Sequence, residues 1–410
     1  MRVLLLNQFY PPDTAATGQL LADVARALAA AGHEVHVVCS RGSYAGGRIP
    51  GLTVQVGEDC IRVHRVSAFS WGRRRSLGRM CDWGSYYVLA IGQCLRLGRF
   101  DACLALTTPP FIGAIGGLLK QMRGTRLVLW TMDLWPEVAE ALGTIRPGSW
   151  ASRMLRRLAG WVYNQADAVV SLGSEMTQRL CKLGVAREKI VSVHNWVPSE
   201  VVSPMPRGRG FLDNRIVNND QFVVMHSGNM GRSHEFDTIL AAAELLKNDG
   251  SVIFVFAGDG QCRQTLIQDV ERRNLSNVQF IQPVPLEHLA ELLAVAHVHL
   301  VSLRQGLEGL LVPSKIYGIL AAGRPAIMVG STRNEVAQLL RDSGAGLMVE
   351  SGRTEELASA IRNLRDRPDW ARQMGQAGRE FYEQNLGRDR SVAAIVGEIT
   401  RRREAKGALE

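Results

Sequence analysis

The sequence predicts an α/β protein built from two doubly wound domains, each with a parallel sheet covered by helices on both faces. Short β-branched or aliphatic runs alternate with longer segments of helical period along the 410 residues. Strand and helix in turn are typical of parallel sheets, because their crossover connections are helices. The length suits about two to three domains, and a stretch rich in Pro and Ser at 197–206 divides the chain near its middle.

Each half carries its own set of strand and helix signals. Predicted helices include 18–31, which Gly32 closes, 150–165 and an amphipathic tail at 389–408. The predicted domains are 1–198 and 199–388, and we expect the segment 389–410 to pack back on the first of them. The expected strands are 3–6, 34–39, 61–66, 102–106, 126–131, 168–172 and 190–194, then 222–226, 252–257, 278–281, 298–302, 326–329 and 346–349.

Composition excludes several classes of protein. Apolar residues make up 46% and charged residues 21%, which are globular proportions rather than disordered or collagen-like ones. The seven cysteines form no C-x-x-C pair, and the nine histidines show no H-E-x-x-H spacing, so we expect no metal and no cofactor. The odd, dispersed set of cysteines favours buried thiols in a reducing cytosol. Neither a signal peptide nor a transmembrane segment is expected.

The positive charge is concentrated in the first half. Residues 1–198 hold 23 Lys and Arg against 13 Asp and Glu, whereas 199–410 hold 25 against 26. This excess favours a polyanionic partner or an anionic membrane surface, and no nucleic-acid recognition module is evident. Cationic and aromatic side chains suited to such a membrane contact, or to an acceptor, gather at Arg73, Arg74, Arg75, Arg79 and Trp83. A solvated basic helix face is the alternative.

The first half offers two candidate motifs. The loop 7–18 follows the first strand and opens a helix near Gly18, where free backbone N–H groups favour an anion. It lacks G-x-G-x-x-G, so no nicotinamide-binding fingerprint is present. After a later strand, Asp133 and Glu137 stand beside Trp and Pro. Asp133 is a candidate catalytic carboxylate at the end of a strand, and capping of the next helix is the structural alternative.

The second half offers a glycine-rich loop after its first strand. Two glycines, a cation and the start of a helix favour a diphosphate, since the helix dipole, backbone donors and positive charge converge. A plain turn between strand and helix is the alternative. Isolated histidines such as His226 are interpreted as core residues. The candidate donor-binding residues of the loop are Gly228, Asn229, Gly231, Arg232 and His234.

The densest motif is 308–325. Pro313 is predicted at a helix start, where Ser314 and Lys315 bring a hydroxyl, free N–H groups and an ammonium together. That end suits a nucleotide diphosphate without a metal. Glu308 precedes the helix and can accept hydrogen bonds from sugar hydroxyls.

Together these residues resemble a known family. The sequence is similar to the retaining glycosyltransferases of family 4, which have the GT-B fold of two Rossmann-like domains facing across a cleft. The resemblance covers essentially the whole chain. It rests on Tyr10-Pro-Pro-Asp13 with Gly18, Trp130-Thr-Met-Asp-Leu-Trp-Pro-Glu137, Gly228-Asn-Met-Gly231, Ala257-Gly-Asp-Gly260, and Val312-Pro-Ser-Lys-Ile-Tyr317 with Ala322-Gly-Arg-Pro325. Some of these motifs resemble a sub-branch of aminosugar transferases of capsule, O-antigen and colanic-acid assembly, which commonly act on undecaprenyl-diphosphate-linked sugars.

The resemblance implies a role for each candidate residue. The second domain would hold a nucleotide-sugar donor and the first domain an acceptor, with transfer that retains configuration and needs no metal. Glu308 matches a glutamate that contacts the donor sugar, and Ser314 with Lys315 falls on a phosphate-binding segment. Gly18 matches the glycine of a first-domain loop. The second glutamate of the family motif is Gly318 here, and Val284 is expected to line the nucleobase pocket.

The resulting hypothesis is a metal-independent retaining transferase of surface polysaccharide biosynthesis. It would move a sugar, of N-acetylated hexosamine type, from a UDP-sugar to a lipid-linked or glycan acceptor at the inner face of the plasma membrane. Two alternatives stay open: a nucleotide-sugar 2-epimerase, and a catalytically silent scaffold that binds nucleotide sugars. The base, the sugar, the acceptor, the linkage and the oligomeric state are not fixed by the sequence.

Overall fold

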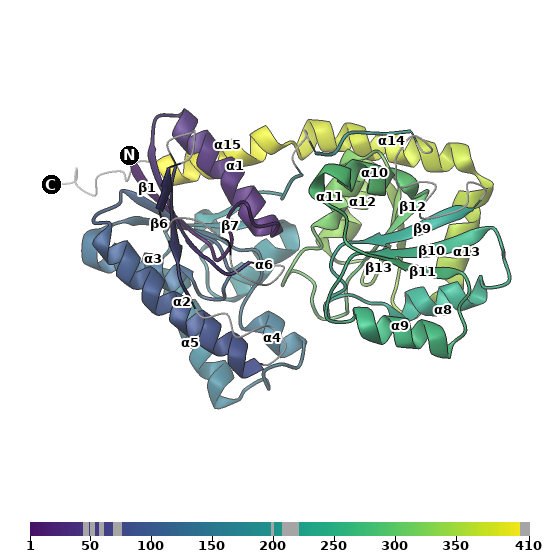
Figure 1. Cartoon of the computed structure of the whole chain (residues 1–410), viewed down its shortest axis with the longest axis horizontal. Coiled ribbons are helices and arrows are strands. Elements are labelled where there is room, and N and C mark those ends of the chain that lie inside the picture. Colours follow the sequence, from purple (N-terminus) through teal and green to yellow (C-terminus); the bar gives the residue numbers. More distant parts are fainter. Residues whose placement is uncertain are drawn as a thin grey trace. The chain divides into compact units, whose positions relative to one another are not determined.

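The computed structural model describes residues 1–43, 49, 54–56, 61–68, 76–197, 201–206 and 221–401. These residues form two compact units (Figure 1). The first unit comprises Met1–Gly173, Thr177–His194 and the C-terminal segment from Asp389. The second comprises Ser174–Met176 and Asn195–Arg388.

The first unit is built on an eight-stranded sheet in the order β3-β4-β2-β1-β5-β6-β7-β8. Neighbouring strands are parallel except β3 and β4, which are antiparallel. The edge strand β3 is not among the predicted strands, because its three residues are too few to show a periodic pattern. The strands are β1 (Arg2–Leu6), β2 (Glu34–Ser40), β3 (Val54–Val56), β4 (Arg62–Val66), β5 (Ala102–Ala105), β6 (Arg126–Trp130), β7 (Ala168–Ser171) and β8 (Ile190–Ser192).

Strand order decides which helices cover which face of this sheet. The chain moves from β1 to β2 in one direction, then crosses from β4 to β5 and onward in the other. Right-handed crossovers therefore place α1 on one face and α2, α3 and α5 on the opposite one (Figure 1). The helices in this part of the chain are α1 (Ala16–Ala30), α2 (Ser76–Arg96), α3 (Gly113–Arg123), α4 (Glu137–Ala141), α5 (Trp150–Gln165), α6 (Ser174–Lys182) and η1 (Arg187–Lys189).

The C-terminal helix α15 (Arg388–Thr400) belongs to the first unit from Asp389 on. The guanidinium of Arg126 donates to the carbonyl oxygen of Glu398 at 3.0 Å and lies 3.6 Å from its carboxylate. These contacts join the helix to β6. The tail helix predicted through residue 408 ends at Thr400, and residues 402–410 lie outside the described part of the chain.

The second unit contains a six-stranded parallel sheet in the order β11-β10-β9-β12-β13-β14. Both faces are buried, because alternate residues of β9 pack into separate apolar clusters: Val224 into one and Met225 into the other. The elements are β9 (Phe222–Ser227), α8 (Asp237–Leu245), β10 (Val252–Ala257), α9 (Arg263–Arg272), β11 (Val278–Ile281), η2 (Leu286–His288), α10 (Leu289–Val295), β12 (Val298–Ser302), α11 (Lys315–Ala321), β13 (Ala326–Val329), α12 (Glu335–Ser343), β14 (Gly346–Val349), α13 (Thr354–Asp366) and α14 (Pro368–Asn385).

Each sheet has a point at which the strand order reverses. In the first sheet it lies between β1 and β5, and in the second between β9 and β12. Ligands of doubly wound sheets bind at the carboxyl ends of strands at such switch points. The loops after these four strands are therefore where the topology favours binding.

Candidate functional site

Two glycine-containing loops meet backbone to backbone at the carboxyl end of the second sheet. One loop follows β9 and the other follows β10. Gly228 and Gly258 have φ angles of 107° and 132°, which residues with a side chain rarely adopt. A Cβ atom on Gly258 would lie 2.2 Å from the carbonyl oxygen of Gly228. The amide of Met230 donates to the carbonyl oxygen of Asp259 at 2.8 Å, and this bond ties the two loops together.

A lysine–histidine contact lies beside these loops. Lys315, the first residue of α11, places its Nζ 2.8 Å from Nε2 of His226, a buried residue of β9. Burial lowers the pKa of Lys315 to about 7. It also lowers the pKa of His226, with the charge of Lys315 as a second cause. A neutral imidazole offers one ring nitrogen as an acceptor, so Lys315 donates to His226. The ammonium is thus held at the switch point of the second sheet, where an anion could neutralise it.

A second histidine packs against the first. The Nδ1 atom of His234 lies 2.8 Å from the carbonyl oxygen of Ser302, the last residue of β12. Its ring stands nearly perpendicular to that of His226, with centroids 5.2 Å apart. Burial is the main cause that lowers the pKa of His234 to about 3, and the charge of Lys315 adds to it. Both imidazoles are therefore uncharged at neutral pH, and they position neighbouring groups rather than supply positive charge.

The loop that carries Glu308 is tied to the glycine loop after β9. It connects β12 to α11, and the amide of Arg304 donates to the carbonyl oxygen of Ser233 at 2.9 Å. The half-buried carboxylate of Glu308 accepts a hydrogen bond from the amide of Gly306 at 2.9 Å. The structure therefore brings the loop of Glu308, the loop 228–234 and Lys315 to the same edge of the second sheet.

The remaining donor-site candidates of the second unit lie on loops around this edge. Arg232 is exposed, and its carbonyl oxygen accepts a hydrogen bond from the side chain of Arg304 at 3.3 Å. Asn229 and Gly231 share the loop after β9, and Val284 follows β11. Ser314 is exposed and caps α11 without a side-chain hydrogen bond.

Two predicted helix starts are shifted in the structure. The helix predicted to start at Pro313 begins at Lys315, so the proline precedes the helix instead of lying in its first turn. The helix predicted to open near Gly18 begins at Ala16.

Gly18 belongs to the first unit, whereas the other donor-site candidates belong to the second. A Cβ atom here would come within 3.1 Å of the backbone carbon and oxygen of Phe9. The loop 7–18 folds back on α1 at this point, and Asp13 accepts a hydrogen bond from the amide of Ala15 at 2.8 Å. Close packing alone therefore accounts for the glycine.

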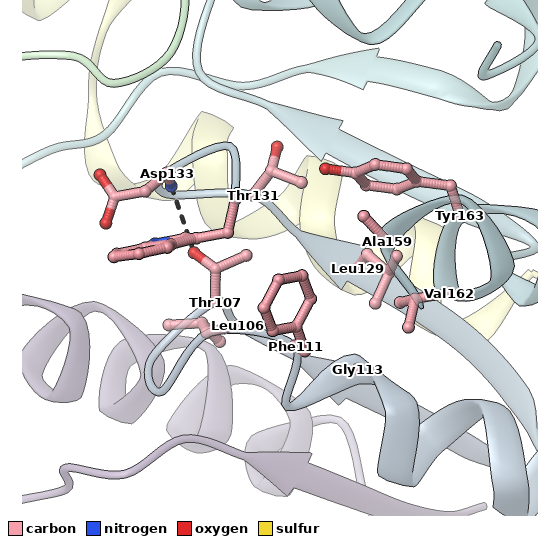
Figure 2. Close-up of a pocket in the computed structure, with 11 residues that line it drawn as sticks. Leu106, Thr107, Phe111, Gly113, Leu129, Thr131, Asp133, Ala159, Val162 and Tyr163 are labelled. Carbon is pink, nitrogen blue, oxygen red and sulfur yellow. Dashed lines mark hydrogen bonds between the residues drawn. The ribbon is translucent and has the colours of Figure 1, made fainter. Parts of the chain in front are cut away.

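Asp133 lines a small cavity in the first unit (Figure 2). The cavity is about 30 Å³, room for one or two water molecules. Apolar side chains such as Phe111 and Val162 form most of its wall, with the polar groups of Thr131 and Tyr163. The amide of Asp133 donates to Oγ1 of Thr107 at 3.2 Å, which connects the ends of β6 and β5. Burial raises the pKa of the Asp133 carboxyl to about 6.

Comparison with known proteins bears on this geometry. Residues 16–196 match the model of a glycosyl transferase 4-like domain, and residues 221–367 match that of glycosyl transferases group 1. The chain belongs to the glycosyltransferases of family 4. This family is retaining and metal-independent, and the two sheets form its GT-B fold.

Individual relatives agree with the family and the fold. The chain is 25% identical to the Escherichia coli (strain K12) protein named as the colanic acid biosynthesis glycosyl transferase WcaI, over 97% of this chain and 100% of that one. Its fold is similar to that of sucrose-phosphate synthase from Thermosynechococcus elongatus, with a TM-score of 0.78, 17% identity and coverage of 96% and 97%. It is also similar to Anabaena HepE in complex with UDP, with a TM-score of 0.70, 15% identity and coverage of 96% and 98%.

The basic and aromatic candidates of this glycosyltransferase are only partly described. Arg73, Arg74 and Arg75 lie outside the described residues, and Arg79 lies on α2, where its side chain is not described. Trp83 is half-buried and packs edge-on against Trp135, with ring centroids 6.5 Å apart. Since Trp135 lines the Asp133 cavity, Trp83 supports the wall of that cavity.

One residue of the candidate site, His226, is not among the predicted site residues. His226 was interpreted as a core residue, and it is buried, yet its Nε2 accepts the hydrogen bond of Lys315. A signal was present in the sequence, because His226 is a polar residue near the carboxyl end of a buried strand that leads into Gly228. Polar residues at that end of a parallel strand face the ligand edge of the sheet.

The Asp133→Asn variant is expected to be more stable and less active. The pKa of Asp133 in the folded protein, about 6, is raised above its ordinary value of 3.8. The ionised carboxylate therefore destabilises the fold above pH 6, and the cost vanishes below about pH 4. We expect the amide to raise the free energy of unfolding by about 1–3 kcal/mol at pH 8 and to change it little at pH 4. Urea unfolding at both pH values measures this, and equal stability at pH 8 would contradict it.

Proposed function

We propose that this enzyme transfers a sugar of N-acetylated hexosamine type from a UDP-sugar to a lipid-linked or glycan acceptor during the assembly of bacterial surface polysaccharide. The contact between Lys315 and His226 at the switch point of the second sheet carries the proposal. The name of WcaI refers to colanic acid biosynthesis and supports a role in the assembly of surface polysaccharide. The complex of HepE with UDP-glucose supports the donor class. The sequence resemblance supports an acceptor linked to undecaprenyl diphosphate.

In this proposal the donor diphosphate rests on the loop after β9 and against the ammonium of Lys315. Glu308 accepts hydrogen bonds from hydroxyls of the donor sugar, and Val284 lies beside the nucleobase. During transfer the bond from C1 of the sugar to the diphosphate oxygen breaks, while the acceptor oxygen bonds to C1 on the same face. The acceptor proton passes to a phosphate oxygen of the donor. Lys315 stabilises the diphosphate as its negative charge grows.

The proposed role of Asp133 is to hold the acceptor. Asp133 is half-buried and lines a largely apolar cavity in the first unit, and its carboxylate points away from Phe111 and Val162 (Figure 2). A carboxylate in such surroundings gains a strong partner when an acceptor hydroxyl donates to it. Asp133 would therefore orient the acceptor hydroxyl that attacks, while Lys315 would stabilise the negative charge of the leaving group.

A thermal-shift screen tests the donor assignment. UDP-, GDP- and ADP-sugars are added in turn to the wild-type protein and to the Lys315→Ala variant. UDP-sugars should raise the melting temperature of the wild type clearly more than that of the variant, because the stabilisation grows with the affinity of the folded state for the ligand. A shift produced by GDP- or ADP-sugars in place of UDP-sugars would contradict the choice of base. An equal shift in both proteins would contradict the site.

Incubation with a UDP-sugar and no acceptor separates the alternatives. A transferase should release UDP slowly, since water replaces the missing acceptor. A nucleotide-sugar 2-epimerase would instead convert the sugar to its C2 epimer, and a silent scaffold would do neither. Either of the last two results would overturn the proposed function.

Donor affinity is expected to fall as pH rises above 7. The pKa of Lys315 is about 7 in the free protein, and a bound diphosphate raises it by favouring the charged form. Binding then takes up a proton, so affinity is constant below pH 7 and falls by up to about tenfold per pH unit above it. Calorimetric titration with a UDP-sugar, whose diphosphate does not titrate in this range, measures the slope. The Lys315→Met variant should show no fall of affinity with rising pH.

The proposed location is cytoplasmic and peripheral to the plasma membrane. Among the described helices none combines the length and the apolarity needed to cross a bilayer. The basic excess of the first half and the run of Arg73, Arg74 and Arg75 before α2 support contact with an anionic inner leaflet.

A further inference from the structure

Exposed large hydrophobic side chains are concentrated on three helices of the first unit. In the described part of the chain, eleven such residues are exposed, and eight of them lie on α2, α3 or α5. The most exposed are Val88 at 72%, Trp150 at 71% and Met122 at 63%. Single exposed apolar residues are ordinary, but a cluster marks a surface that is covered in use.

The three helices are neighbours on one face of the sheet (Figure 1). The guanidinium of Arg123, on α3, donates to the carbonyl oxygen of Leu95, on α2, at 3.0 Å. On its other side α3 packs on α5, because a Cβ atom on Gly117 would lie 2.8 Å from the ring of Trp161. The helices therefore form one continuous layer, and their exposed residues point away from the sheet that they cover.

The exposed apolar residues follow the helical period. On α5, Trp150, Met154 and Leu158 are spaced four residues apart and lie along one side of the helix. Leu118 and Met122 have the same spacing on α3. We call the set of exposed residues Val88, Leu89, Leu95, Leu118, Met122, Trp150, Met154 and Leu158 the apolar face.

The charged residues of the three helices are almost all basic. Two of them pair with acidic residues of neighbouring elements: Lys120 with Asp167, and Arg156 with Glu137 and Glu140. The sequences of α2, α3 and α5 contain seven Lys or Arg and a single acidic residue, Asp82. Arg153 and Arg157 are exposed on α5 beside Trp150 and Met154. Apolar residues, a tryptophan and arginines on one surface are typical of helices that lie in the headgroup region of an anionic bilayer.

We propose that the apolar face docks on an anionic lipid bilayer, with Trp150, Met154 and Met122 inserted among the lipids and Arg153 and Arg157 at the phosphates. The proposal rests on the membrane location proposed above, and it assigns the contact to three folded helices in addition to the segment 73–79. A second copy of the chain is a poorer occupant, since a two-fold interface would bring the arginines of both copies together.

Sedimentation with vesicles tests the proposal on the full chain. The wild-type protein is expected to bind vesicles that contain phosphatidylglycerol and to bind pure phosphatidylcholine weakly. Combining Met122→Ser, Trp150→Ser and Met154→Ser should lower the partition coefficient about tenfold or more, because membrane binding scales with the apolar area buried. Combining Arg153→Gln and Arg157→Gln should remove much of the salt-sensitive part of the binding.

Matched variants keep the outcomes distinct. Leu245→Ser with Leu286→Ser removes exposed leucines of the second unit and should leave vesicle binding unchanged. The thermal shift with a UDP-sugar should be the same in all variants, which verifies the fold and tests the proposed function separately.

Three results would overturn the apolar-face proposal: wild-type binding by the triple serine variant, equal wild-type binding to both lipids, or a dimer that the triple variant dissociates. If only Arg73→Ser, Arg74→Ser and Arg75→Ser together abolish binding, the membrane location holds and the apolar face is wrong.

Discussion

The Lys315→Ala variant is expected to lower kcat/KM for the donor by about two to three orders of magnitude. The ammonium is held against His226 at 2.8 Å, so it is in place before the leaving group develops its charge. Removing one preorganised hydrogen-bond donor to a developing negative charge typically lowers the rate by about two to three orders of magnitude. Steady-state kinetics with a UDP-sugar and a lipid-linked acceptor measure the loss.

Two further variants separate chemistry from folding. Lys247→Ala removes the other lysine of the second unit, which lies beyond the end of α8, and should leave kcat/KM unchanged. Lys315→Met keeps a long side chain and removes the charge. Because burial already lowers the pKa of Lys315 to about 7, the free energy of unfolding should stay the same or rise. Near-normal turnover by Lys315→Ala would show that the diphosphate binds elsewhere.

The second large effect is expected for Glu308→Ala. Its carboxylate lies on the loop that hydrogen bonds to Ser233 and so to the glycine loop after β9. Loss of hydrogen bonds to the donor sugar should lower kcat by about 10²-fold or more if they tighten in the transition state. The thermal shift produced by UDP alone should change little, because UDP carries no sugar to transfer.

Glu308→Gln separates the hydrogen bond that Glu308 accepts within its loop from the effect of its negative charge. The amide oxygen can still accept from Gly306, as the carboxylate does at 2.9 Å, while the negative charge is lost. We expect activity between that of the wild type and that of the alanine variant. Glu350→Ala, at an exposed position after β14, is the matched control. If Glu308→Ala binds UDP-sugar and turns over normally, Glu308 does not contact the sugar.

The fold was predictable because its signal is periodic and repeated. The four central strands of the second sheet are short apolar runs buried on both faces, as Val224 and Met225 of β9 illustrate, and such runs alternate with helices. The antiparallel strand β3 was missed since three residues at a sheet edge carry no period. The helices predicted to begin near Gly18 and at Pro313 each begin two residues away in the structure, because local cap signals locate a helix end only approximately.

The candidate site was predictable where backbone chemistry limits the choice of residue. Gly258 is required by its φ angle and by the carbonyl oxygen of Gly228, and such requirements are visible as glycines in the sequence. His226 was missed because its role depends on a partner 89 residues away in the chain. The apolar face was missed for a similar reason: only the packing of α2, α3 and α5 shows which apolar residues stay exposed.

A crystal structure of the protein with UDP would show where the diphosphate binds. We expect the diphosphate to lie on the loop after β9, with one of its oxygens within hydrogen-bond distance of Nζ of Lys315. We also expect His226 to keep its contact with the same nitrogen. A diphosphate bound at another edge of the sheet, with Lys315 and His226 paired as they are here, would contradict this expectation.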